Sequence, residues 1–318
     1  MNKVISKSKI MKPDIAVRIA NRNDIEGIVD LQKRVYPQYY RDTPFFVWQC
    51  FENVNQSVLI IARQNTAIVG MLGIQKIQTT NGLFGGQFSW IVVAENKRKS
   101  GLFAKMSSLA LESFPALDFI FIFANRNALL PCAKTLGIKF IGDGYQLISK
   151  NNSADTCTAS YLEHIDIRTV FNNIPCSERG ISFLKTERYR RWRYANSTVH
   201  QYFKLSIPSG EYAIIKIFNE KQSSRIIGDI VDFECNILDI QQIRRLFNAV
   251  FFKLKKMGAK IVTTWAVPGS TLRCVLEEMG FSESDPCSSF GINILNEKYD
   301  HLYNVNAWHL VQSDATNY

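Results

Sequence analysis

The feature that most limits how this chain can fold is that one succession of secondary-structure patterns occurs twice. The first copy consists of a strand pair at 57–78, a third strand at 82–94, a helix at 100–114, a buried strand at 117–125 and a short helix at 127–137. The second copy keeps this order at 199–220, 225–235, 239–258, 260–267 and 270–281. This order predicts an α+β unit with a mainly antiparallel sheet, present twice.

Matches at single residues support a duplication. Trp48 precedes Asn53 just before the first strand pair, and Trp192 precedes Asn196 just before the second. Both short helices begin with Leu-x-Cys and end at a glycine. A strand at 15–20 and a helix at 21–37 precede the first copy, and a closing strand at 138–142 or 145–150 follows it.

The division into domains follows from a polar stretch at 151–160, which has no periodicity and is typical of a linker. We predict an N-terminal domain at 15–150, a linker at 151–180 and a C-terminal domain at 181–318. A length of 318 residues suits two domains of ordinary size.

Composition narrows the class of partner. The net charge of +10 favours polyanionic or phosphorylated partners. The seven cysteines contain no C-x-x-C pair and the four histidines no metal-binding spacing, so no metal is predicted. No apolar run approaches the ~18 residues of a membrane span, and the basic N-terminus has no apolar core of signal-peptide length. We expect a soluble cytoplasmic protein with reduced thiols.

The densest positive charge lies where the third strand of the first copy passes into a helix. Lys97, Arg98 and Lys99 are followed by Ser100 and Gly101. A helix N-terminus leaves backbone N–H groups unpaired and carries partial positive charge. A glycine there lets a phosphate approach the main chain, so this turn predicts an anion site. The alternative is a solvated basic loop.

The spacing of this turn resembles the acetyl-CoA signature of the GNAT acetyltransferase superfamily. Val93 takes the place of the strand-ending Val, Arg98 that of the Arg, and Gly101 that of the central Gly. Two positions depart from the pattern, because Lys99 stands where a glycine is usual and Phe103 where a small residue is usual. The resemblance covers most of 15–148 and, more weakly, 181–295. It implies two GNAT-like domains, each a mixed, mainly antiparallel sheet flanked by helices.

The same resemblance implies a cofactor site. The pantetheine arm of acetyl-CoA would lie in a splay between the strands ending at Val93 and Ala124. The implied contacts to the pantetheine are main-chain groups near Ile91, Val92 and Val93. Those to the pyrophosphate are the side chain of Arg98 and the N–H groups of Lys99, Ser100, Gly101, Leu102 and Phe103. Asn125 or Asn127 would lie near the arm, or either would simply cap a helix.

The catalytic groups are less well marked. Where the family often has a Tyr that protonates the thiolate, this sequence has Cys132, Ala133 and Lys134. The second copy has no Arg-x-x-Gly and places Asp239 where phosphate would approach, so we predict one cofactor site.

A candidate base lies near the end of the chain. His309 and Asp314 could accept an amine proton there, or they are a surface histidine and a turn aspartate. Asp232 and Glu234 alternate on one face of a strand and would line a cleft or face solvent.

The acceptor is predicted from looser features. Three arginines around Trp192, at 190, 191 and 193, could hold a phosphorylated acceptor or stack on bases, or could surround a structural tryptophan. Paired domains with the Trp-x-x-x-x-Asn-like element and the Trp308-His-Leu ending resemble tandem GNAT proteins of bacterial surface-polysaccharide synthesis. That resemblance implies N-acetylation of a nucleotide-linked amino sugar for lipopolysaccharide, O-antigen or capsule.

Two alternatives stay open. One is N-acetylation of an amino acid or peptide amine. The other is a non-catalytic module that binds CoA or nucleic acid. Nucleic acid is disfavoured because the charge is not concentrated on one helix. The sequence predicts no oligomeric state.

Overall fold

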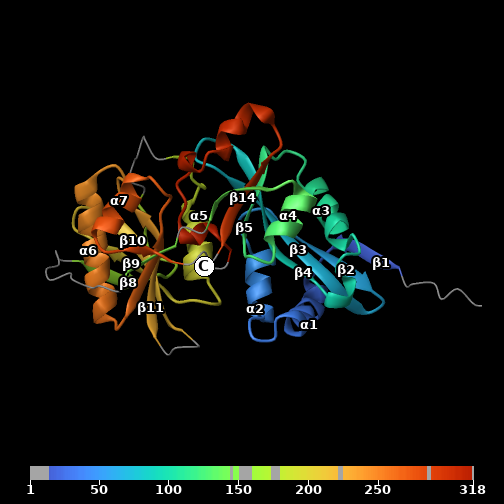
Figure 1. Ribbon diagram of the computed structural model, residues 1–318. Coiled ribbons are helices and arrows are strands. Elements are labelled where there is room, and N and C mark those ends of the chain that lie inside the picture. Colours follow the sequence, from blue (N-terminus) through green and yellow to red (C-terminus); the bar gives the residue numbers. More distant parts are fainter. Residues whose placement is uncertain are drawn as a thin grey trace, which may run out of the picture.

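The computed structural model describes residues 14–143, 146–149, 160–172, 180–220, 225–284 and 288–316. In these ranges the chain forms two seven-stranded sheets that lie side by side, with helices on their outer faces (Figure 1). Each sheet is mixed and mainly antiparallel, as the sequence predicted.

The first sheet has the order β1-β2-β3-β4-β5-β14-β6. Its strands from the first half are β1 (Ile15–Ile19), β2 (Ser57–Gln64), β3 (Ala67–Gln78), β4 (Phe84–Val93), β5 (Phe119–Ala124) and β6 (Lys139–Asp143). Its helices are α1 (Ile25–Val35), α3 (Leu102–Glu112) and α4 (Leu129–Leu136). Only β4 and β5 pair in parallel, because α3 forms the crossover between them.

The second sheet has the order β13-β7-β12-β11-β10-β9-β8. Its strands from the second half are β8 (Tyr161–His164), β9 (Tyr202–Ser206), β10 (Tyr212–Asn219), β11 (Ile226–Glu234), β12 (Ile261–Trp265) and β13 (Ser282–Glu283). Helices α6 (Ile240–Lys256) and α7 (Thr271–Glu278) cover it. Here the parallel pair is β11 with β12, the counterpart of β4 with β5.

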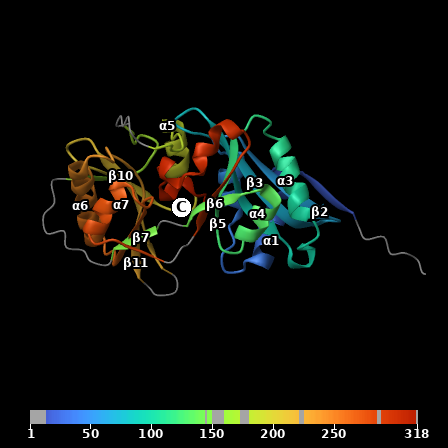
Figure 2. The same ribbon diagram turned by 45° about the horizontal axis from the view of Figure 1, so that its top comes forward.

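The two halves exchange a strand. β7 (Gln146–Ser149) leaves the first half and pairs between β12 and β13, and Figure 2 shows it, in green, among the orange strands. β14 (Ser289–Ile294) makes the reciprocal move and pairs between β5 and β6. Neither sheet is therefore built from one continuous range, and the expected division after residue 150 does not separate the sheets.

The range expected as a linker, 151–180, is partly structured. It contains β8, which pairs antiparallel with β9 at the edge of the second sheet. The polar stretch that suggested the linker falls almost entirely on 150–159, outside the described residues.

A pair of matching turns joins the halves. α2 (Thr43–Phe46) continues into the π-helical turn η2 (Val47–Phe51), and α5 (Glu187–Arg190) continues into the π-helical turn η4 (Arg191–Ala195).

These turns bring the two repeated tryptophans together. The rings of Trp48 and Trp192 stack with centroids 5.0 Å apart. Trp48 Nε1 donates to Trp192 O at 3.0 Å, and Trp192 Nε1 donates to Trp48 O at 3.2 Å. Equivalent residues that bond each other reciprocally are what an approximate two-fold relation between the two copies would produce.

The core lies on both faces of each sheet, because alternate residues of a strand point to opposite faces. In β2, Ile60 and Ala62 pack on the α3 and α4 side, whereas Leu59 and Ile61 pack on the α1 and α2 side. In the second half the long amphipathic helix α6 buries its apolar stripe against the outer face.

The end of the described chain covers part of the inner face of the first sheet. Three 3-10 turns, η5 (Glu297–Tyr303), η6 (Val305–Ala307) and η7 (Gln312–Asp314), cross between the two halves (Figure 1). Trp308 fixes their path by packing on Phe119 and Phe290 of the first sheet. In the part of the chain described, no helix is both long and apolar enough to cross a membrane.

Candidate functional site

A cavity of about 340 Å³ opens where β4 and β5 separate. The two strands pair only from Gly85–Gln87 to Phe119–Phe121, and beyond these residues they diverge. The lining residues are Gln32, Tyr36, Tyr39, Gln87, Phe88, Ser89, Trp90, Ile91, Val92, Ile122, Phe123, Ala124, Asn125, Ala128, Ala315 and Thr316. The splay that the sequence resemblance implied is therefore present as a hollow.

A β-bulge in β4 shapes one wall of this cavity. Met71 pairs with Val92 and Gly73 pairs with Ser89, so β4 contains one residue more than β3 over this stretch. The bulge places Trp90 at φ 54, a left-handed conformation that costs a bulky residue about 1–3 kcal/mol. The indole N–H of Trp90 is also buried without an acceptor among the described residues. Strain and an unpaired donor at one wall are typical of a binding site.

The predicted pantetheine contacts divide at this bulge. Ile91 and Val92 line the cavity. Val93 instead pairs with Gly70 in the sheet, and it is not among the described residues that line the hollow.

The predicted phosphate turn lies directly after β4. Gly101 is the N-cap residue of α3 at φ 77 and places no side chain on the helix end. The first i→i−4 bond of this helix runs from Lys105 N to Gly101 O at 3.1 Å, which leaves the N–H groups of Leu102, Phe103 and Ala104 outside the ladder. The open N-terminus with three unpaired donors suits an anion.

Lys99 takes the conformation that its position demands even though it is not glycine. Its φ is 61, in the left-handed region where a glycine pays no penalty and a lysine pays about 1–2 kcal/mol. Ser100 closes the turn through its Oγ, which donates to Lys97 O at 2.6 Å. A lysine at position 99 therefore makes this turn less stable than a glycine would, while the backbone still takes the left-handed conformation.

Arg98 and Phe103 are placed differently from each other. The Arg98 side chain is about half exposed; its Nε donates to Val93 O at 3.4 Å and its guanidinium lies 3.6 Å from the Glu95 carboxylate. Phe103 packs against the core beneath α3, so its bulk points away from the turn.

The equivalent positions in the second half are closed. Asp239 caps α6 by accepting from Gln241 N at 2.9 Å and Gln242 N at 3.1 Å, so a carboxylate already occupies that helix end. The gap beyond the β11–β12 pair is filled by η7, where Gln312 Nε2 donates to Thr263 Oγ1 of β12 at 2.9 Å.

The two asparagines differ in position. Asn125 lines the cavity, and its side-chain oxygen accepts from the N–H groups of Asn127 and Ala128, both at 3.1 Å. It therefore caps the turn before α4 as well as facing the hollow. Asn127 is exposed.

Cys132, near the place of the missing tyrosine, is fully buried. Burial raises the pKa of its thiol to about 12.

The proposed base residues have other partners. The Asp314 carboxylate lies 3.0 Å from Lys185 Nζ and accepts from Val311 N at 2.8 Å, and the His309 ring packs edge-on against Phe233 at 5.7 Å. Burial raises the pKa of Asp314, and Lys185 opposes this effect. These contacts place Asp314 in an ion-pair cluster beside the cavity, whereas its neighbours Ala315 and Thr316 face the hollow.

The carboxylates of β11 are buried and do not face solvent. Asp232 Oδ1 lies 3.1 Å from Lys185 Nζ, and Asp232 Oδ2 accepts from Tyr194 OH at 2.8 Å. Glu234 pairs with Arg190 at 2.9 Å.

The other arginines beside Trp192 are also engaged internally. Arg193 donates to Ala315 O at 2.9 Å, and Arg191 pairs with Glu187 at 2.6 Å. Arg190 is buried and pairs with Glu234. All three arginines thus have partners within the protein, and Trp192 packs on Trp48.

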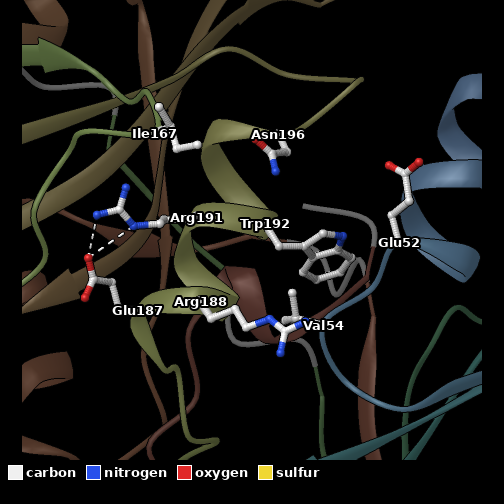
Figure 3. A pocket seen from close by; sticks show the side chains of 8 residues that line it. All are labelled: Glu52, Val54, Ile167, Glu187, Arg188, Arg191, Trp192 and Asn196. Carbon is white, nitrogen blue, oxygen red and sulfur yellow. Dashed lines mark hydrogen bonds and ion pairs between the residues drawn. The ribbon is translucent and has the colours of Figure 1, made fainter.

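A larger groove of about 500 Å³ lies beside these arginines. Figure 3 shows Arg188 reaching toward Val54 beside Trp192, while Arg191 turns away toward Glu187. Glu52 also lines the groove, so its two arginines and two glutamates cancel in charge.

Sequence reasoning missed a chain of buried amides behind the cavity. Asn53 Nδ2 donates to Gln75 Oε1 at 2.8 Å, Gln75 bonds Gln87, and Gln87 Nε2 donates to Asp314 O at 2.7 Å. The only signal for it was Asn53 in the repeated Trp-x-x-x-x-Asn-like element. Tyr36, Tyr39 and Thr316 had no signal, because their role depends on which elements meet at the hollow. No group of three or more potential metal ligands occurs within the described ranges.

Comparison with known proteins rests on the fold. No family model matches the chain, and no curated protein matches it in sequence. Among solved structures, it is similar to a GCN5-related N-acetyltransferase from Anabaena variabilis, with TM-score 0.63 and 12% identity, over 89% of this chain and 74% of that one.

Two further structures inform the comparison. A tandem GNAT protein from the clavulanic acid biosynthesis pathway matches with TM-score 0.54 and 12% identity, over 88% of this chain and 98% of that one. A GCN5-related glucosamine N-acetyltransferase region of a fungal multi-domain β-N-acetylglucosaminidase matches with TM-score 0.57 and 13% identity, over 89% of this chain and 38% of that one. With the duplicated sheets, the open α3 turn and the β4–β5 hollow, these likenesses show that the chain has the GNAT fold, built twice.

Proposed function

We propose that the protein is an acyl-CoA-dependent N-acyltransferase that binds acetyl-CoA once, in its N-terminal half. One observation carries the proposal: the first copy keeps both an uncapped helix N-terminus after β4 and a hollow between β4 and β5, whereas in the second copy Asp239 caps the helix and η7 packs where the corresponding strands end. Two copies of one fold thus differ at the two features that a pyrophosphate and a pantetheine arm require.

The proposed cofactor contacts follow from this geometry. The pyrophosphate would accept from the N–H groups at the start of α3, with Arg98 turning from Glu95 to add a charged contact. Each charge-assisted hydrogen bond contributes about 1.5–3 kcal/mol. The pantetheine arm would lie against Ile91 and Val92, between β4 and β5, where the two strands no longer pair with each other.

The reaction needs a neutral amine and a polarised thioester carbonyl. Tyr36, Tyr39 and Ser89 line the cavity, and their hydroxyl groups are candidates to relay a proton there. The indole N–H of Trp90 is buried beside this wall, and a shift of the ring on binding would be needed to bring it to an oxygen of the substrate.

The proposed acceptor is an amino sugar. Its support is the fold likeness to a glucosamine N-acetyltransferase region and the exposed Tyr36 and Tyr39, whose rings suit stacking on a sugar. A nucleotide diphosphate on that sugar would accord with the net charge of +10. Arg190 and Arg193 are buried and bonded within the protein, and Arg191 pairs with Glu187 at the surface, so such a diphosphate would have to bind other cations or displace Glu187.

Acetyl-CoA turnover with a panel of amines tests the function. The panel would contain glucosamine, 3-amino and 4-amino nucleotide sugars, and amino acid and peptide amines, with thiol release and acetylated product both measured. We expect product only from amino sugars. Product from peptide amines alone would refute the acceptor class, and CoA binding without turnover of any amine would favour a non-catalytic CoA-binding module.

A further inference from the structure

The end of the described chain forms part of the proposed active site. Ala315 and Thr316 line the hollow between β4 and β5, although they lie more than 190 residues after those strands in the sequence. No regular secondary structure holds this segment, because after η7 it leaves the 3-10 turn in extended conformation. Its position must therefore come from side chains that bind it.

Three contacts to three different elements hold this segment, two through its backbone oxygens and one through the side chain of Gln312. Gln87 of β4 donates to Asp314 O at 2.7 Å, and Arg193 of η4 donates to Ala315 O at 2.9 Å. Gln312 donates to Thr263 of β12 at 2.9 Å. The segment is thus bound to both sheets and to the turn at the Trp48–Trp192 contact.

A buried cation adds the strongest of the constraints. Lys185 Nζ lies 3.0 Å from Asp314 Oδ1 and 3.1 Å from Asp232 Oδ1, and it donates to Ser313 Oγ at 2.9 Å. Burial alone would lower the pKa of Lys185, but the two carboxylates raise it, so the lysine remains charged. Asp232 is itself fixed by Tyr194 OH. Lys185 therefore connects β11 to two consecutive residues of the segment.

The geometry points to residues 312–316 as the wall that contacts the acceptor, with Lys185 and Arg193 as positioning residues that hold it against β4. This inference rests on the proposed function. The cofactor would be held by the β4 bulge and the start of α3, neither of which contacts Lys185. Displacing the wall should therefore disturb the acceptor and spare acetyl-CoA.

The test compares Lys185→Met with Lys204→Met. Lys204 is a matched control, because it is a buried lysine in β9 of the second sheet. Its Nζ bonds Val170 O at 2.6 Å and lies 3.8 Å from Glu163, and these partners are not in the wall. With the best amine from the panel, Lys185→Met should raise the KM for the amine at least tenfold and leave the KM for acetyl-CoA within twofold. Lys204→Met should change neither.

Two further variants keep the inference falsifiable if Lys185→Met does not fold. Asp314→Asn removes one charge of the cluster and should raise the KM for the amine several-fold. Thr316→Trp adds bulk to the wall itself and should exclude the amine while calorimetry shows unchanged CoA binding. Equal changes in both KM values, or none, would overturn the inference.

Hydrogen exchange separates this inference from the proposed function. Lys185→Met should lose protection of the amides at 311–316, with or without CoA, and Lys204→Met should not. Full protection in Lys185→Met would refute the positioning role. If no amine of the panel reacts, both the enzyme assignment and the contact between the wall and the acceptor are refuted, whatever the hydrogen-exchange result.

Discussion

Gly101 offers the sharpest test of where acetyl-CoA binds. It lies at φ +77, and a Cβ built there meets no atom within 4 Å. Substitution by alanine therefore causes no clash, and its cost to folding is the left-handed conformation alone, about 1–2 kcal/mol. The lower entropy of the unfolded chain returns about 0.4–1 kcal/mol. The expected loss of stability is about 1 kcal/mol.

The loss of binding is a separate quantity. The added methyl group would occupy open space at the start of α3, where we place the pyrophosphate. Keeping the phosphate from one backbone donor removes about 1.5–3 kcal/mol, which corresponds to a ten- to hundredfold weaker affinity. Calorimetric titration with CoA measures this change directly.

Gly269 supplies the control. It lies at φ +76, its Cβ would also meet nothing within 4 Å, and it precedes α7 in the second half. Gly269→Ala should therefore lose the same stability in denaturant unfolding and bind CoA as the wild type does. If both variants bind CoA equally well, the phosphate site is not at Gly101 and the reasoning is refuted.

The remaining predictions concern charge and packing. Arg98→Ala should weaken CoA binding three- to tenfold in the same titration. Glu95→Gln should strengthen it slightly, because the Glu95 carboxylate competes with the phosphate for Arg98. Tighter binding by Arg98→Ala than by Glu95→Gln would contradict a contact between Arg98 and the phosphate. Burial, followed by Lys216, Arg41 and Arg193, lowers the pKa of His200 to about 3. His200 therefore takes up a proton near pH 6.5 in the unfolded state but not in the folded state. The free energy of unfolding should fall by up to about 1.4 kcal/mol per pH unit as the pH drops below 6.5. His200→Gln should make this pH dependence shallower in urea unfolding. Trp48→Phe and Trp192→Phe each remove one of two reciprocal hydrogen bonds. Each should lower the free energy of unfolding by a similar amount, on the order of 1–2 kcal/mol. A large difference between the melting temperatures of the two variants would argue against the two-fold relation.

The local signals in the sequence were sufficient for most of the elements of both copies and for the open turn before α3. Spacing of apolar residues predicted the strands and helices of both copies, because i+2 and i+4 neighbours share a face whatever the rest of the chain does. Gly101 after a basic run predicted an open helix start, and Asp239 predicted a closed one. Both are properties of one turn of backbone, so a few adjacent residues decide them.

Contacts between distant residues were decided only in the tertiary structure. β7 and β14 satisfy the same alternating pattern in either sheet, so the sequence could not show that they exchange. Likewise, an arginine beside a tryptophan can bind a ligand or a distant backbone carbonyl equally well. Arg193 in fact donates to Ala315 O, 122 residues away. Asp314 and His309 were candidates for a catalytic pair, and only the fold shows that the Asp314 carboxylate lies 3.0 Å from Lys185. Such choices depend on which surfaces pack together, and packing brings into contact groups whose separation in sequence carries no signal.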